Sequence, residues 1–317
     1  MEKGIFTISL DFELHWGLFD ILTIEQKAEA YRITCQVIPQ MLDLFEEFDV
    51  EVTWAIVGML YNKNESEWQN NFPSKIPNFI NSNLSAYNFA NQGKPLSTYP
   101  HSFFAPHLIE KIKNAKGQEI GTHTYAHYYC LEPGQNQDDF DEDLKKAVGL
   151  AQNKDVKIQS IVFPRNQFNE EYVDACVKNN IIFLRTNPKV WFWDTKKKQN
   201  LRKKIVRTLD CYLPLSKTTY KIGTIIREKG VSFLPASRFL REPSKFGFLD
   251  RMRIKRIKNE MYYAAKNNEV YHLWWHPHNF SKKSIQSLQE LKEIFEHYKF
   301  LEQKFGMVSK SMKNTFH

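Results

Sequence analysis

GIFTISLDFE, residues 4–13, opens the chain with a β-rich apolar run that ends in two acidic residues. Branched and aromatic side chains over 4–12 predict a strand. The apolar residues that precede Asp11 indicate that this strand is buried and that Asp11 and Glu13 lie at its end. In a strand these two positions share a face, where like charges repel unless a cation lies beside them. The sequence therefore predicts a cation site at the end of the first strand.

The rest of the chain alternates strands with helices. Helices are expected at 24–48, 106–115, 138–151, 169–178, 249–265 and 281–305, and strands at 50–57, 119–123, 157–163, 181–185 and 269–275. The first helix is expected to break near Pro39, because proline cannot continue a straight helix. Such alternation predicts an α/β fold of parallel βαβ units, and about seven units that close on themselves make a barrel. An open doubly wound sheet is the rival architecture.

Two stretches interrupt this alternation, at about 62–99 and at 188–245. Long insertions in a barrel usually lie over its active face. The sequence shows no internal repeat and no low-complexity linker. Residues 1–317 are therefore expected to form a single domain with these two insertions.

Composition indicates a globular protein, because 42% of the 317 residues are hydrophobic, enough for a sizeable core. No apolar stretch approaches the ~20 residues that cross a bilayer, and no secretion signal is recognisable at the start. The four cysteines, at 35, 130, 176 and 211, lie far apart, which predicts free thiols in a reducing compartment. The expected location is the cytoplasm.

Positive charge is concentrated in two clusters within a net charge of +8. The first cluster holds Lys196, Lys197, Lys198, Arg202, Lys203, Lys204 and Arg207, and the second holds Arg251, Arg253, Lys255, Arg256 and Lys258. Solvated helix faces are the commoner explanation of such runs. The functional alternative is attraction to an anionic membrane or to a diphosphate-linked sugar, which would place the protein at the inner leaflet. No nucleic-acid-binding module is recognisable, so no nucleic-acid partner is expected.

His123 and His127 follow another expected strand and are four residues apart. A turn of helix or a compact loop would bring both imidazoles to one side, a spacing that clamps transition metals. Such pairs are also frequent by chance on solvated helices. With Glu13 they form a two-histidine, one-carboxylate set that leaves coordination positions open, as catalytic zinc requires. Cys130 is a weaker ligand candidate, because a small buried thiol is its commoner role.

Two further segments end expected strands and would reach the same face of a barrel. Arg165 could grip Asp11 with a bidentate guanidinium, or form an ordinary surface salt bridge. His276 could donate a proton to a leaving amine, and His278 competes with it for that role. Pro277 separates the two histidines, so only one of them is expected to reach the reacting atoms.

Aromatic residues make up 14% of the chain, and several of them flank these candidate site segments. His15 and Trp16 directly follow the two acids and are candidates for contacts behind the ligands or with a substrate. Sugar rings stack on exposed aromatic side chains, but core packing is the commoner use of an aromatic residue.

The acids and histidines resemble the motifs of the polysaccharide deacetylases, carbohydrate esterase family four, over nearly the whole chain. Asp11 looks like the general base of that family and Glu13 like its metal-binding acid. Most members have two adjacent aspartates at this point, whereas here Phe12 intervenes and the second acid is a glutamate. His123 and His127 match the His-x-x-x-His motif of the family without alteration.

Two more residues are similar to motif residues of this family. Arg165 resembles the arginine that orients the base, and His276 resembles the histidine that acts as general acid. The fold that the resemblance implies is a distorted (β/α)7 barrel with long loop insertions.

The resemblance also implies a reaction. A water activated by one divalent metal attacks the acyl carbonyl of an N-acylated amino sugar, Asp11 takes the proton, and His276 protonates the departing amine. Zinc is the expected metal, and cobalt, nickel or manganese would take the same ligands. The substrate expected for a cytoplasmic member is a surface-polysaccharide or glycolipid precursor, including a lipid-linked one, and acetyl is the expected acyl group.

Two alternatives from other classes share some of these features. An iron(II) oxygenase also uses two histidines and a carboxylate, but its carboxylate lies two residues beyond the first histidine in an all-β barrel. A non-catalytic glycan- or lipid-binding protein could use the same scaffold with an altered acid pair. Turnover of an acylated sugar separates this second alternative from an enzyme.

Overall fold

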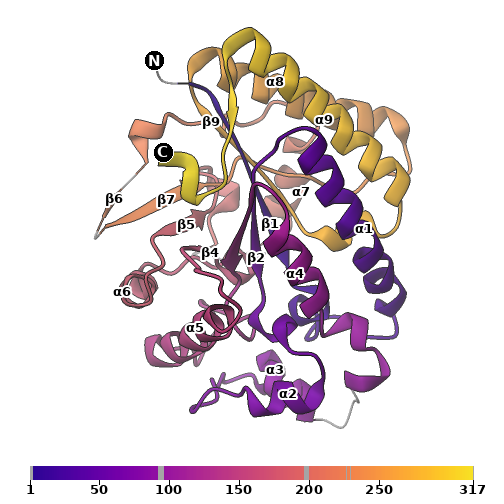
Figure 1. Cartoon of the computed structure of the whole chain (residues 1–317). Coiled ribbons are helices and arrows are strands. Elements are labelled where there is room, and N and C mark those ends of the chain that lie inside the picture. The colour runs from indigo at the N-terminus through magenta and orange to yellow at the C-terminus, as the bar shows by residue number, and fades with distance from the viewer. Residues whose placement is uncertain (1–2, 92–95, 196–199, 226, 229, 317) are drawn as a thin grey trace.

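The computed structural model describes residues 3–91, 96–195, 200–225, 227–228 and 230–316. Its centre is a curled sheet of mainly parallel strands in the order β6-β7-β5-β4-β3-β2-β1-β9-β8, with β10 (Val308–Ser309) paired to β1 (Figure 1). The longer parallel strands are β1 (Ile5–Phe12), β2 (Val52–Ile56), β3 (Gln118–Thr122), β4 (Ser160–Val162), β5 (Phe183–Thr186), β7 (Val231–Pro235) and β9 (Val270–Trp275). This half-barrel confirms the α/β prediction and is consistent with a distorted barrel rather than the rival open sheet.

Helices surround the curled sheet (Figure 1). The longer ones are α1 (Ala28–Glu47), α4 (Pro106–Asn114), α5 (Gln137–Gln152), α7 (Leu201–Asp210), α8 (Gly247–Asn267) and α9 (Ser284–Phe305). Shorter helices are α2 (Glu65–Asn70), α3 (Ala86–Asn91) and α6 (Val173–Lys178). Among the residues that the structure describes, no helix has the length and apolar character needed to cross a membrane.

Helix α1 runs without interruption through Pro39, so the expected break at this proline is wrong. A proline inside a helix costs about 3 kcal/mol. Tyr31, Ile38, Met41 and Phe45 on the inner face of α1 are fully buried or nearly so. Burial of a large apolar side chain contributes roughly 1.5–3 kcal/mol, so this face outweighs the cost of the proline.

The stretch 188–245 was expected to be an insertion, but it also builds part of the barrel wall. It supplies β7, β8 (Arg238–Phe239) and the antiparallel β6 (Arg227–Glu228). Between β7 and β8, Ala236 N–H donates to the Thr186 carbonyl and Ser237 N–H donates to the His272 carbonyl, both at 2.8 Å. These two residues therefore join the β5 side of the sheet to the β9 side.

The other interruption, 62–99, contains α2 and α3, and α2 packs against the segment that follows β1. Trp68 of α2 stacks on Trp16, with ring centroids 5.9 Å apart. Of the first basic cluster, Lys196, Lys197 and Lys198 lie outside the described residues.

Candidate metal centre

The first strand ends at Phe12 and the chain then turns sharply. Asp11 lies inside β1, whereas Glu13 follows the strand and precedes a short helix, Leu14–Gly17. Leu14 has φ of +48°, a left-handed conformation that reverses the chain direction here. Both carboxylates are nevertheless buried and lie on one side, within 4 Å of Nε2 of His276.

Gly17 leaves the space that the Glu13 carboxylate occupies. A Cβ atom at residue 17 would lie 2.1 Å from Cδ of Glu13 and 2.2 Å from Oε1. No side chain larger than hydrogen fits there unless the glutamate moves. The conformation of Glu13 is therefore determined in part by a residue four positions along the chain.

The two histidines project from a compact loop after β3 and not from a helix. Thr124 and His127 both have left-handed φ values, +61° and +54°. The two carboxylate oxygens of Asp143 on α5 accept hydrogen bonds from the N–H groups of Tyr125 (2.7 Å) and Ala126 (3.1 Å). This fully buried aspartate fixes the loop between the two imidazoles.

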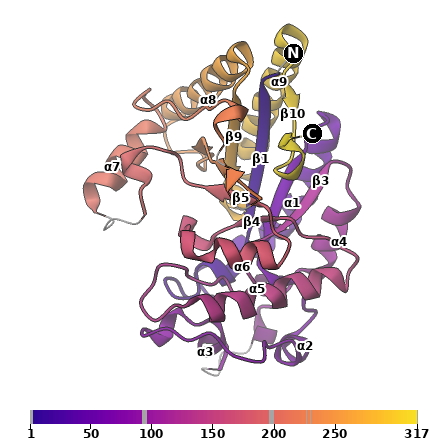
Figure 2. The same ribbon diagram turned by 90° about the vertical axis from the view of Figure 1, so that its left-hand side faces the viewer.

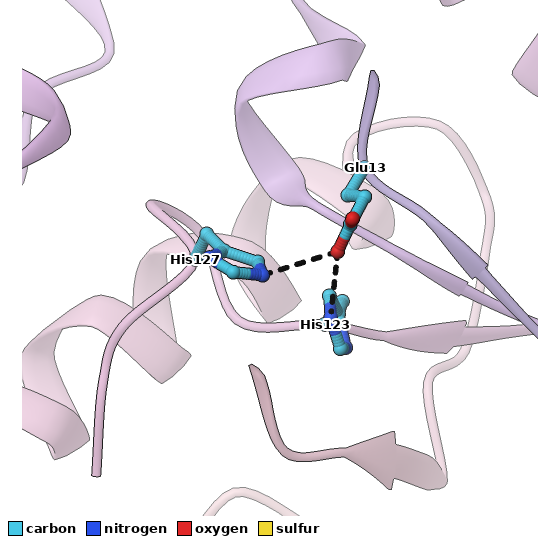
Figure 3. Close-up of side chains that lie close together, drawn as sticks. All are labelled: Glu13, His123 and His127. Carbon is cyan, nitrogen blue, oxygen red and sulfur yellow. Dashed lines mark hydrogen bonds and ion pairs between the residues drawn. The ribbon is translucent and has the colours of Figure 1, made fainter. Parts of the chain in front are cut away.

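Glu13, His123 and His127 converge on one point (Figure 3). Oε2 of Glu13 lies 3.1 Å from Nε2 of His127 and 3.3 Å from Nε2 of His123. One ligand atom from each residue lies within 4.8 Å of the others, and all three residues are buried. The structure thus brings together the three residues that the sequence predicted as metal ligands.

The protonation of this cluster suits a divalent cation. Nδ1 of His123 lies 2.8 Å from the Val162 carbonyl, which can only accept, so Nδ1 carries the proton and Nε2 presents its lone pair. Nε2 of His123 has no hydrogen-bond partner among the described residues. Burial lowers the pKa of His127 and keeps this imidazole neutral. Burial alone would raise the pKa of Glu13, but the nearby His276 and the hydrogen-bonded His127 hold it well below its usual value.

This donor set fits a divalent metal. Two neutral imidazoles and one carboxylate are typical of catalytic zinc sites, which keep positions open for water and substrate. An unpaired buried nitrogen and a buried carboxylate are otherwise costly features. A cation at this point would satisfy both of them.

Arg185 on β5 binds the other carboxylate, that of Asp11. Its guanidinium donates to Oδ1 and Oδ2 of Asp11 at 2.6 and 2.7 Å, and also to Oγ of Ser9 and to Oδ1 of Asn166. Its Cζ lies 4.5 Å from the centroid of the Trp274 ring. Burial alone would raise the pKa of Asp11, but Arg185 lowers it, so this carboxylate is ionised at neutral pH.

The predicted contact between Arg165 and Asp11 is wrong. Arg165 lies beyond the end of β4 with φ of +51°, and its guanidinium donates to Asp20 at 2.6 Å and covers the ring of Tyr129. The same segment instead reaches the network around Asp11 through Asn166. The signal for Arg185 was a charged residue at the end of the expected apolar strand 181–185, since a buried charge requires a partner.

His276 and His278 occupy different places, and His276 is the one that reaches the acids. Its Nε2 lies 3.8 Å from Oδ2 of Asp11 and 3.7 Å from Oε1 of Glu13. The His276 side chain is 23% exposed, whereas both acids are buried, so solvent reaches the site beside this ring. His278 stacks on His276 with centroids 4.9 Å apart. Burial and the neighbouring His276 lower the pKa of His278 to about 3, so it stays neutral.

Two other candidates are packed away from any substrate. His15 is buried against the rings of Tyr31, Phe89 and Phe103. Trp16 is fully buried as well, and its Nε1 donates to the Phe103 carbonyl at 2.8 Å. The chain reversal at Leu14 turns both side chains into the aromatic core, away from solvent.

Cys130 is also buried, and its Sγ points to the Tyr128 carbonyl at 3.5 Å. Burial raises the pKa of this thiol well above its usual value. It does not belong to the cluster formed by Glu13, His123 and His127. Cys130 is therefore a small buried thiol of the core and not a metal ligand.

The family model for polysaccharide deacetylases matches residues 21–181. This chain belongs to the polysaccharide deacetylase family. The matched region contains His123 and His127, but it begins after Asp11 and Glu13 and ends before Arg185. No curated protein matched the chain in sequence.

Solved structures of this family and of others share the fold. A polysaccharide deacetylase from Mycobacterium smegmatis is 14% identical with a TM-score of 0.60, and the match covers 99% of this chain and 89% of that one. One from Pseudomonas aeruginosa PAO1 is 9% identical (TM-score 0.56, 94% and 86% covered). Puue allantoinase is 10% identical (TM-score 0.56, 94% and 85% covered). Because an allantoinase is among them, the fold alone does not define the substrate.

Proposed function

We propose that this member of the polysaccharide deacetylase family removes an N-acyl group, with acetyl the expected one, from an amino sugar by metal-dependent hydrolysis. Family membership supports a deacetylase that acts on carbohydrate. The observation that carries the metal-dependent part is the convergence of Glu13, His123 and His127 within 4.8 Å in a buried site. The ionised Asp11 and the partly exposed His276 border that site.

The three converging residues would hold one divalent ion. Zinc fits two imidazoles and one carboxylate, and cobalt, nickel or manganese would accept the same donors. A bound ion would polarise the acyl carbonyl and lower the pKa of the attacking water. Nδ1 of His123 donates its proton to the Val162 carbonyl, so the Nε2 lone pair would be available to such an ion.

Two residues of the chain would move protons. Asp11 is ionised and oriented by the bidentate Arg185, so it can accept a proton from the attacking water. His276 lies on the solvent side of both acids and can protonate the departing amine. Trp274 packs against His276 with ring centroids 5.7 Å apart and would limit the movement of that ring.

For the substrate, we propose a precursor of a surface polysaccharide or glycolipid, with the sugar on a lipid carrier at the cytoplasmic face of an anionic membrane. The support for this part is the excess of positive charge, +8 overall. Anionic carriers and anionic leaflets attract such a protein electrostatically.

The test combines metal analysis with an assay of acetate release. Wild type should contain close to one zinc or similar ion per chain and should release acetate from N-acetylated amino sugars. A His123→Ala, His127→Ala double variant should contain no metal and be inactive. Asp11→Asn should keep its metal and lose turnover. Wild type that binds no metal after loading, or that binds metal but hydrolyses no N-acyl sugar, would contradict the proposal.

A further inference from the structure

Helix α7 lies at the outer edge of the molecule (Figure 2). The polar and apolar faces of this helix are reversed. Its outward face carries Leu201, Ile205 and Leu209, which are 72%, 51% and 43% exposed. Its inward face carries Lys203 and Asp210, which are buried. Surface helices of globular domains normally have the opposite arrangement. Leu201, Ile205 and Leu209 together form the apolar stripe. A partner that covers the apolar stripe is therefore expected.

Polar contacts on the inward face fix this orientation. Nζ of Lys203 donates to the Asp194 carbonyl at 2.7 Å. Oδ2 of Asp210 accepts from Ser216 at 2.7 Å and lies 3.2 Å from the guanidinium of Arg238. Rotation of α7 to bury the apolar stripe would break these contacts and leave charges without partners. The outward stripe is thus a stable feature of the fold.

Cations flank the apolar stripe. Arg202 and Lys204 are exposed on either side of it, whereas the one acidic residue of α7, Asp210, is buried. Trp191 is 55% exposed beside the helix, and the guanidinium of Arg202 lies 5.7 Å from its ring centroid. In the sequence, three lysines at 196–198 come shortly before α7, separated from it by Gln199 and Asn200. Apolar side chains with flanking cations and an interfacial tryptophan are typical of helices that lie in an anionic membrane surface.

We propose that α7 docks on a membrane that contains anionic lipid, with the apolar stripe inserted among the headgroups and acyl chains. A second copy of this chain is a poorer occupant, because a symmetric contact would bring the Arg202 and Lys204 side chains of two copies close together. The membrane complements both the apolar stripe and its charges. This inference deepens the membrane association proposed above and is independent of the deacetylase chemistry.

The second basic cluster does not compete for this role. Three of its members form ion pairs with acids: Arg253 with Glu290, Arg256 with Glu260, and Lys258 with Glu293. These pairs neutralise much of the charge on α8. The cations beside the apolar stripe therefore fit an anionic surface better than those of α8.

Docking through α7 would bring the site close to the membrane. Arg207 of α7 lies over the ring of Trp193, at 5.2 Å from its centroid. Trp193 contacts Trp274 at 6.0 Å, and Trp274 contacts His276 at 5.7 Å. Only two side chains thus separate α7 from the solvent-facing histidine of the site.

The experiment is vesicle co-sedimentation of the full chain with phosphatidylcholine vesicles, with and without phosphatidylglycerol. Wild type should bind the anionic vesicles. Leu201→Ser, Ile205→Ser, Leu209→Ser should weaken binding by on the order of tenfold or more, because the inserted apolar area is lost. Arg202→Gln, Lys204→Gln should weaken it by roughly fivefold for each cation, and high salt should mask this second effect.

Matched controls carry the same changes elsewhere. Ile285 is 76% exposed on α9, so Ile285→Ser controls for loss of an exposed apolar residue. Lys266→Gln, Lys304→Gln repeats the charge change on α8 and α9. Both controls should bind like wild type, and all variants should hydrolyse a water-soluble substrate equally. Vesicle binding that the serine variant leaves unchanged would overturn the proposal, as would an oligomer in solution that this variant dissociates.

Discussion

Among single side chains, Arg185 determines the ionisation and the orientation of the Asp11 carboxylate. Its guanidinium donates to both carboxylate oxygens and also to Ser9 and Asn166. A lysine keeps the charge but cannot make a bidentate contact. We expect Arg185→Lys to lower kcat by about 10- to 100-fold, as losses of supporting contacts around metal sites do, with KM and metal content little changed. Steady-state kinetics with metal analysis would measure this.

Arg165→Lys is the matched control for that variant. Arg165 pairs with Asp20 and does not contact Asp11, so kcat of this variant should stay within a few-fold of wild type. If Arg165→Lys lost more activity than Arg185→Lys, the original prediction from the sequence would be right and the arrangement described for Asp11 would be wrong.

Gly17 makes a second prediction at this scale. A methyl group at this position would overlap the Glu13 carboxylate, whose end is flexible and can move at little cost. Gly17→Ala should therefore keep the melting temperature close to wild type but weaken metal binding by at least about tenfold. Metal titration monitored by calorimetry would measure the change.

Gly149→Ala is a control with the same chemical change. Gly149 lies in the last turn of α5, and apart from its own stretch of helix no atom of the described residues lies within 4 Å of a Cβ at this position. This variant should bind metal normally and gain roughly 0.5–1 kcal/mol of stability, because alanine favours helix over glycine. Equal metal affinity in the two alanine variants would show that Gly17 does not position Glu13.

The ligands could be predicted from the sequence because their signals are local: two acids after an apolar strand, and two histidines four apart. Arg185 could not be assigned, since its partner lies 174 residues away on a strand that meets its own only across the curled sheet. The prediction for Arg165 failed although the residue does follow β4, because its left-handed backbone turns the side chain away from Asp11. Backbone conformation at a single residue is not visible in residue types.

At the scale of elements, α5 supports the histidine loop through Asp143. Both oxygens of its carboxylate accept backbone N–H groups between the two histidines. An asparagine would turn an NH₂ group toward one of these donors. Asp143→Asn should lower the free energy of unfolding by about 1–3 kcal/mol, the cost of an unsatisfied buried donor, and should weaken metal binding.

The control for this element is Asp138→Asn, an exposed acid in the first turn of α5. Loss of its interaction with the helix dipole should cost only about 0.3–1 kcal/mol and leave metal binding unchanged. Urea unfolding of both variants, with and without zinc, separates the two effects. Unaltered zinc affinity in Asp143→Asn would mean that the loop holds its shape without this contact.

Most long elements were predictable, because apolar periodicity marks them. The failures share a cause: tertiary contacts overrode the local signal. Pro39 stays inside α1 because the helix face is buried, and the short strands β7 and β8 arise because 231–239 completes the sheet between β5 and β9. Two-residue strands such as β8 carry no periodicity that a sequence could reveal.

For the whole molecule, a polar network inside the half-barrel links the site to the stability of the fold. Arg185 donates to Oγ of Ser9, and Oγ of Ser9 lies 2.9 Å from Nε2 of His272 on β9. His272 is completely buried, and burial followed by the charge of Arg185 lowers its pKa from 6.5 to about 3. The folded protein therefore holds this histidine neutral under conditions where the unfolded chain would protonate it.

The sign of the pH dependence follows from this linkage. Below pH 6.5 the unfolded state binds a proton at His272 that the folded state excludes, so stability is lost as the pH falls toward 3. The loss from this group is about 1.4 kcal/mol per pH unit. Between about pH 6.5 and pH 5 the buried acids Asp11 and Glu13, whose pKa values are lowered, stay ionised and add little.

His272→Gln should remove this contribution, since a glutamine does not titrate and its side-chain oxygen can still accept from Ser9. As the pH falls from 6.5 toward 3, the free energy of unfolding measured by urea titration should then decrease less steeply than in wild type. The difference between the two slopes should be about 1.4 kcal/mol per pH unit. The exposed His101 supplies the control, because His101→Gln should follow the wild-type slope. His278 is also held neutral, whereas burial raises the pKa of Asp143 to about 7 and acts in the opposite direction, so the slope that remains in His272→Gln is the sum of these opposed contributions. A slope identical to wild type would show that His272 is protonated inside the fold, and that the Arg185 network tolerates a second buried cation.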